Sequence, residues 1–119
     1  MAKIVDQTFG QSLRELRRSK GVSQRDLAEK VGVDFSYISK VENDRLPPPA
    51  ADTIVKICKE LGVPPHELLA STGKMPTDVK EMLSTSTSAL EFVRQAHDMD
   101  ITEDEWKSLT KRLRRLRSD

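Results

Sequence analysis

Two short helical patterns joined at a single glycine constrain this chain more than any other feature. They lie at residues 23–43, SQRDLAEKVGVDFSYISKVEN. Ser23 can cap a first helix because its hydroxyl accepts from backbone amides, and Gly32 can end that helix by adopting a positive φ. Asp34 is a good N-cap for a second helix that runs to about Asn43. The segment therefore predicts two helices joined by a tight turn, which is the pattern of a helix-turn-helix.

The second predicted helix has one apolar face and one polar face. At about 100° per residue, Ile38 and Val41 share the buried side. The opposite side carries a ridge of Ser36, Ser39, Lys40 and Asn43, flanked by Phe35 and Tyr37. Hydroxyl, ammonium and amide groups can reach the donors and acceptors that distinguish base pairs in the major groove. We therefore expect sequence-specific DNA binding, with a merely solvated helix face as the alternative.

The spacing SQ-x-x-LA-x-x-x-GV-x-x-x-x-IS-x-x-EN, which starts at Ser23, resembles the Xre family of bacterial and phage regulators. That family includes the lambdoid repressors and Cro, and the resemblance covers roughly Phe9 to Leu69. It implies an all-α fold with a five-helix repressor-like domain. It also implies that Arg17 pairs with Glu42, a pair that would fix the angle of the recognition helix.

Three features depart from the family pattern. Asp44 stands where the family often has glycine, but Asp tolerates the left-handed region better than most residues, so we expect the turn to be kept at a small cost. The run Pro47-Pro48-Pro49 predicts a stiff, extended connection. Phe35 occupies a position that is often polar in the family, where it can offer only apolar contact or stacking.

Two sets of DNA-contacting residues follow from the helix geometry and the resemblance. The expected base contacts are Phe35, Ser36, Ser39 and Lys40, and the expected phosphate contacts are Gln24, Arg25, Tyr37, Asn43 and Arg45. Lys40 can donate to guanine O6 and N7. Gln24, at a helix start, can donate to a phosphate and brace the recognition helix.

Three more helices complete the predicted domain. Thr8 opens a capping box before a helix that ends near Ser19, a further helix runs from Asp52 to Leu61, and a short one opens at Pro64. We expect a DNA-binding domain at 1–71, a linker at 72–77 and a C-terminal helical oligomerisation region at 78–119.

The C-terminal region is predicted to hold amphipathic helices behind capping boxes at Ser88 and Thr102. Their apolar positions, which we expect to mediate dimerisation, are Leu90, Val93, Trp106, Leu109, Leu113 and Leu116. A helix of this size is marginal alone, and its apolar stripe needs another surface. Docking on a second copy is favoured because helix-turn-helix proteins usually read two half-sites as dimers, and packing within one chain is the alternative.

Composition limits the other function classes. A chain of 119 residues with 33% charged residues and a net charge of +1 allows one compact domain with an appendage. No apolar run is long enough for a membrane span and no secretory signal is apparent, so we expect a cytoplasmic protein.

Cys58 is expected to be a core thiol, and with His66 and His97 it has no zinc spacing, so we expect no metal and no cofactor. No catalytic constellation is present, and an enzyme is not expected.

These patterns predict a dimeric transcription regulator that binds a palindromic operator in double-stranded DNA, with repression favoured over activation. The near-neutral charge predicts modest non-specific binding and a specificity that depends on the dimer. The alternative is an antitoxin or adaptor, in which the helix-turn-helix anchors the chain to DNA and the C-terminal helices bind an antagonist or toxin protein.

Overall fold

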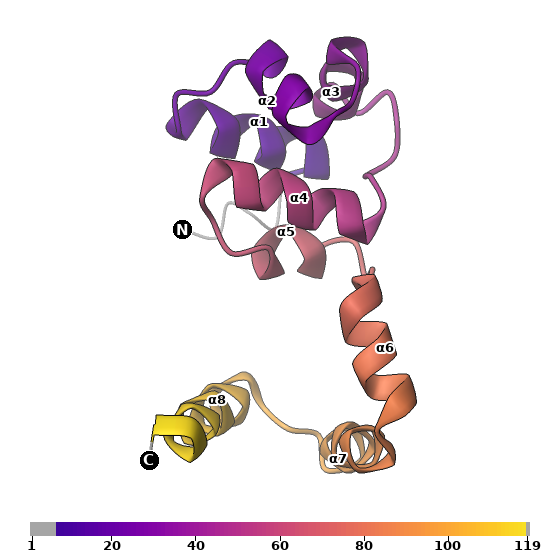
Figure 1. The fold of residues 1–119 in the computed structure, drawn as a ribbon, viewed down its shortest axis with the longest axis vertical. Helices are drawn as coiled ribbons and strands as arrows, with labels where there is room; N and C mark the ends of the chain where they lie inside the picture. The colour runs from indigo at the N-terminus through magenta and orange to yellow at the C-terminus, as the bar shows by residue number, and fades with distance from the viewer. Residues whose placement is uncertain (1–6, 119) are drawn as a thin grey trace. The chain divides into compact units, whose positions relative to one another are not determined.

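The computed structural model describes residues 7–118, and within that range the chain is all-helical, which confirms the predicted fold class (Figure 1). The helices are α1 (Phe9–Ser19), α2 (Gln24–Val31), α3 (Phe35–Glu42), α4 (Ala51–Leu61), α5 (His66–Ala70), α6 (Thr77–Thr85), α7 (Thr87–Asp98) and α8 (Glu103–Ser118). The chain divides into two compact units, with the boundary between Asp78 and Val79.

The first unit has one hydrophobic core, to which helices α1 to α5 each contribute. Its fully buried side chains include Leu13 of α1, Leu27 of α2, Ile38 of α3 and Ile54 of α4, and Leu68 of α5 closes the cluster. Helix α1 packs against α3 and α5, while α2 packs against α3 and α4. Figure 1 shows α2 and α3 together at one end of this unit and α5 at the other. The two helices of the helix-turn-helix are therefore supported by packing of α3 against α1 and of α2 against α4.

Cys58 lies in this core, as predicted. It is 1% exposed, and burial raises the pKa of its thiol, which favours the protonated form. A neutral, buried thiol is a poor nucleophile and a poor metal ligand. Its role is packing.

Local sequence signals set most helix ends of the first unit. The capping box of Thr8 and Gln11 is present, and Gly32 and Gly62 end their helices with φ of 86° and 73°. Asp34 stands at the N-cap of α3, but the expected side-chain cap bond is absent. Instead its backbone carbonyl accepts from Tyr37 at 3.0 Å. Three predicted ends were off by one or two residues: α3 ends at Glu42, α4 begins at Ala51 and α5 begins at His66.

The segment predicted as a linker is bonded to the first unit. The ammonium of Lys74 donates to the carbonyl oxygens of Pro48 and Pro49, each at 2.9 Å. The amide and hydroxyl of Thr77 donate to the carboxylate of Asp52 at 2.9 and 2.7 Å. These contacts fix residues 74–77 against the loop before α4 and the first turn of α4.

The second unit contains α7, α8 and most of α6. The predicted capping box at Ser88 is wrong, because α7 begins at Thr87 and Ser86 caps it by accepting from the Ala89 amide at 3.1 Å. The box of Thr102 and Glu105 at the start of α8 is confirmed. Phe92 and Trp106 meet edge to face, with ring centroids 6.4 Å apart. Among the described residues of this unit, Ala96 is the one buried apolar side chain.

Candidate nucleic-acid interface

Helix α3 exposes a polar ridge above a buried face. Ile38 and Val41 lie in the core, while Ser36 and Lys40 are exposed and Ser39 is half-buried. Phe35 begins the helix and is 40% exposed. The structure thus brings the four predicted base-contacting residues to one accessible side of a single helix.

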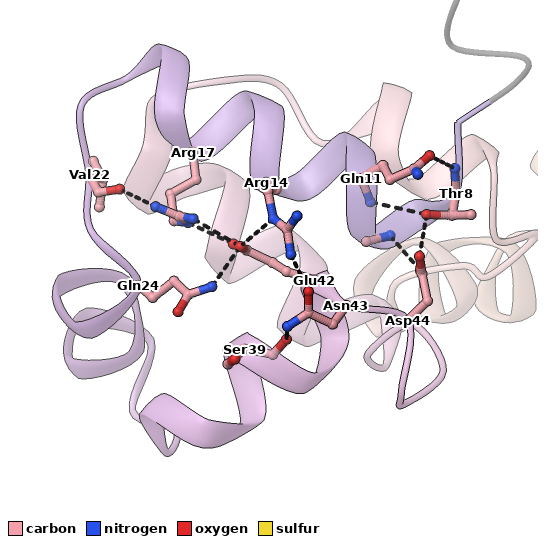
Figure 2. Close-up of polar contacts among 11 residues, drawn as sticks. Thr8, Gln11, Arg14, Arg17, Val22, Gln24, Ser39, Glu42, Asn43 and Asp44 are labelled. Carbon is pink, nitrogen blue, oxygen red and sulfur yellow. Dashed lines mark hydrogen bonds and ion pairs between the residues drawn. The ribbon is translucent and has the colours of Figure 1, made fainter.

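The last residue of α3, Glu42, is a buried carboxylate that anchors the helix to its neighbours. Arg17 donates to it through two nitrogens, Nε at 2.6 Å and Nη2 at 2.9 Å, and also donates to the Val22 carbonyl at 2.9 Å. Gln24 donates to the same carboxylate at 2.8 Å. Figure 2 shows these side chains converging on Glu42 from α1 and α2. A bidentate arginine restricts orientation as well as position, so this cluster fixes how α3 is presented.

The ionisation of Glu42 depends on these donors. Burial alone would raise the pKa of Glu42, but hydrogen bonds from Arg17 and Gln24, with the charge of Arg17, hold the pKa below its ordinary value. The same bond raises the pKa of Arg17 against the opposing effect of burial. Both groups therefore remain charged at neutral pH, and the α3 anchor is a true ion pair.

Arg14 is a second guanidinium at this anchor, and our sequence reasoning missed it. Its Nε lies 3.5 Å from the Glu42 carboxylate, and its Nη2 donates to the side-chain carbonyl of Asn43. Asn43 also donates to the Ser39 carbonyl at 2.9 Å. Arg14 lies three residues before Arg17 on α1, and this spacing could have indicated that both arginines share the helix face beside Glu42. Asn43 thus uses its amide oxygen and one amide hydrogen in bonds to neighbouring residues of the domain.

Asp44 closes the turn after α3 in a way that local pattern did not reveal. It adopts the left-handed region expected of it, with φ of 59°. Its carboxylate accepts from the Thr8 hydroxyl at 2.7 Å and from the Gly10 amide at 3.2 Å (Figure 2). The N-terminus of α1 thereby stabilises the negative charge of Asp44. These two hydrogen bonds also attach the left-handed turn after α3 to α1.

The predicted phosphate contacts have different surroundings. Arg25 and Arg45 are exposed, and Arg25 stacks over the Phe35 ring. Tyr37 is half-buried and packs against the core, and burial raises the pKa of its hydroxyl. Gln24 keeps its carbonyl oxygen and one amide hydrogen for other partners after its bond to Glu42. Within residues 7–118, no cluster of His, Cys, Asp and Glu side chains has the geometry of a metal site.

Two short helices joined by a glycine turn, with the second presenting a polar ridge, define a helix-turn-helix DNA-binding domain. A helix-turn-helix family model matches residues 13–68. The uncharacterized HTH-type transcriptional regulator RghRB of Bacillus subtilis is 32% identical over 112 residues, which cover 87% of this chain and 81% of that protein. The chain therefore belongs to the Xre-type helix-turn-helix family and is a DNA-binding transcriptional regulator, not an enzyme.

Two further similarities extend beyond the matched domain. The HTH-type transcriptional repressor RghR of Bacillus subtilis is 26% identical over 111 residues, which cover 88% of this chain and 82% of that protein. Among solved structures, a SinR protein/SinI protein complex is similar with a TM-score of 0.50 and 26% identity, over 94% of this chain and 100% of that one. The similarity to these regulators thus includes the C-terminal helices. Among residues 7–118, no helix is long and apolar enough to cross a membrane.

Proposed function

We propose that this regulator is a repressor that binds a palindromic operator as a homodimer in the cytoplasm. The observation that carries the proposal is the exposed ridge of α3, held in one orientation by the buried Glu42 cluster. Preorganised donors on one helix suit insertion into a major groove. Repression is supported by the similarity to RghR, which is named a repressor.

The proposed contacts divide into base reading and positioning. Phe35, Ser36, Ser39 and Lys40 are assigned to base edges, and Gln24, Arg25, Tyr37, Asn43 and Arg45 to the phosphate backbone. Asn43 is the weakest of these assignments, because its bonds to Ser39 and Arg14 leave one amide hydrogen for a phosphate. Arg45 is exposed beyond the end of α3 and is the simplest of the five to test.

Replacing Lys40 by Ala is expected to weaken binding to the preferred duplex by about 1–3 kcal/mol and to relax preference at one base position. The reason is that an exposed ammonium on the ridge can donate to a guanine edge. Arg45→Ala is the matched control: it should weaken binding to all sequences equally and reduce the salt dependence. Selection from a random duplex pool, followed by titration of both variants, makes the comparison. Equal loss on every sequence for Lys40→Ala would show that Lys40 does not read a base.

Dimerisation is proposed through the C-terminal helices. Leu90, Val93 and Trp106 are 54%, 41% and 38% exposed, although large apolar side chains on short helices favour burial. Leu113 and Leu116 are exposed further along α8, on the same stripe as the half-buried Leu109. A second copy of this surface would cover the stripe through a two-fold interface. Phe92, 51% exposed beside Trp106, joins the proposed interface although the sequence pattern had not indicated it.

Replacing Leu113 by Asp is expected to convert the dimer to a monomer. Affinity for a full palindrome should then fall by roughly tenfold or more, because the second DNA-binding domain is no longer linked to the first and must bind its half-site independently. Ser108→Asp adds the same charge on α8 outside the stripe and should leave the dimer intact. Sedimentation and operator titration on both full-length variants provide the measurements. A Leu113→Asp chain that still sediments as a dimer would contradict the proposed interface.

A second candidate function is capture of an antagonist protein by the same helices. The similarity to the SinR protein/SinI protein complex along nearly the whole chain favours it. A neighbouring reading frame that encodes a small protein, and a chain that is monomeric until that protein is added, would support this candidate over the homodimer. A stable dimer without any partner would support the first proposal.

A further inference from the structure

Arg25 and Phe35 form a stacked pair on the surface of the helix-turn-helix. The guanidinium carbon of Arg25 lies 4.6 Å from the centroid of the Phe35 ring. Arg25 is in the first turn of α2, and Phe35 is the first residue of α3, so the stack joins the starts of the two helices. Across residues 7–118, no carboxylate forms an ion pair with Arg25. Within that range, the guanidinium of Arg25 instead contacts the aromatic ring of Phe35.

Phe35 is more exposed than the aromatic side chain two residues later on the same helix. It is 40% exposed, whereas Tyr37 is half-buried and packs against the core cluster. A cation held over an aromatic face is attractive even at an exposed site, so Arg25 favours the ring orientation in which the two side chains stack. The stack thus presents an apolar surface at the N-terminus of α3.

The chemistry of a phenyl ring limits what it can read in DNA. It has no hydrogen-bond donor or acceptor, so it cannot distinguish bases through their polar edges. The major groove offers one apolar base-specific feature, the C5 methyl group of thymine. Arg25 keeps its planar N–H donors while stacked, and these suit a phosphate oxygen beside the ring.

We propose that Arg25 and Phe35 act as one thymine-reading unit, in which Phe35 contacts the C5 methyl group of a thymine and Arg25 positions the ring while holding a phosphate. The inference rests on the proposed function, because it requires α3 to enter the major groove. It assigns to Arg25 a role in specificity that a phosphate contact alone lacks.

The test uses the full-length chain and the duplex that it selects from a random pool. Each thymine of that duplex is replaced singly by deoxyuridine, which removes the methyl group and keeps the hydrogen-bonding edge. Affinity is expected to fall about fourfold at one position in each half-site, the effect of one buried methyl group. With Phe35→Ala the same replacement should have no effect. Arg25→Ala should lower both the affinity and the ratio of thymine to uracil affinities.

Two controls separate this reading from simpler ones. Arg45→Ala removes a cation outside the stack and should lower affinity without changing the thymine-to-uracil ratio. Ser36→Ala, next to Phe35 on the ridge, should also leave that ratio unchanged. If the parent chain tolerates deoxyuridine at every position, or if Phe35→Ala keeps the parent's sensitivity, the thymine-reading unit is wrong while operator binding stands. If the chain selects no duplex at all, the proposed function and this inference both fail.

Discussion

Replacing Arg17 by Met is expected to lower the free energy of unfolding by about 3–5 kcal/mol, the usual consequence of leaving a buried charge without its partner. The Glu42 side chain has no exposed surface, and Arg17 supplies two of its hydrogen bonds. Gln24 and Arg14 remain near the carboxylate in this variant, but they replace neither the bidentate geometry nor the bond to Val22. Urea denaturation of the parent and variant measures the loss.

Two matched variants define what the Arg17 result means. Arg18→Ala removes an exposed cation from the same helix and should change stability by no more than about 0.5 kcal/mol. Combining Arg17→Met with Glu42→Leu removes both charges and should recover much of the stability, because an apolar pair has no buried charge to solvate. An Arg17→Met variant as stable as Arg18→Ala would contradict the anchoring role of the ion pair.

The pH dependence of this loss has a defined sign. The pKa of Glu42 in the folded parent lies below its ordinary value, so its stabilisation is complete above that value and is lost as pH falls through the folded pKa. Removing Arg17 raises the folded pKa of Glu42 relative to the parent. The gap in stability between parent and Arg17→Met is therefore expected to narrow as the solution is acidified from pH 7 through the ordinary glutamate range. A gap that is constant with pH would mean that lost packing, not charge, causes the destabilisation.

The sequence specified the helices of the first unit better than the contacts between them. Gly32, Gly62 and the Thr8 capping box mark helix ends through interactions within a few residues, and local pattern contains that information. The bonds from Arg14 to Asn43 and from Thr8 to Asp44 join residues 29 and 36 positions apart. No local period specifies such pairs, because they arise only when α1 packs across the end of α3.

The C-terminal region shows a different limit. Its hydroxyl-rich run offers several N-caps of nearly equal chemistry, so Ser86 and Ser88 cannot be distinguished without the packed helices. Phe92 was missed because its partner, Trp106, lies on another helix. On α3, helix periodicity was sufficient to predict that Ile38 and Val41 are buried and that Ser36 and Lys40 are exposed. The Arg25 stack on Phe35 required the crossing of α2 and α3, which sequence periodicity does not encode.

Replacing Gly10 by Ala is expected to destabilise the fold by about 2–3 kcal/mol, although the same change in an open helix is normally stabilising by about 0.5–1 kcal/mol. A Cβ atom at Gly10 would lie 2.4 Å from the Val41 carbonyl oxygen, 2.6 Å from that of Glu42 and 2.7 Å from the Asp44 carboxylate. Two of these atoms are backbone at the end of α3, so relief requires α1 and α3 to separate.

A separation of α1 from α3 is expected to lower the affinity for operator DNA as well as the stability of the domain. The Gly10 amide donates to Asp44, and the residues that follow on α1 hold Glu42, so a displaced α1 alters the orientation of the whole ridge. Gly10→Ala should therefore lose operator affinity even at temperatures where it remains folded, whereas Ser19→Ala, an exposed change near the other end of α1, should keep both stability and affinity. Thermal unfolding and operator titration are the measurements. A Gly10→Ala chain as stable as the parent would mean that α1 does not press this closely on α3.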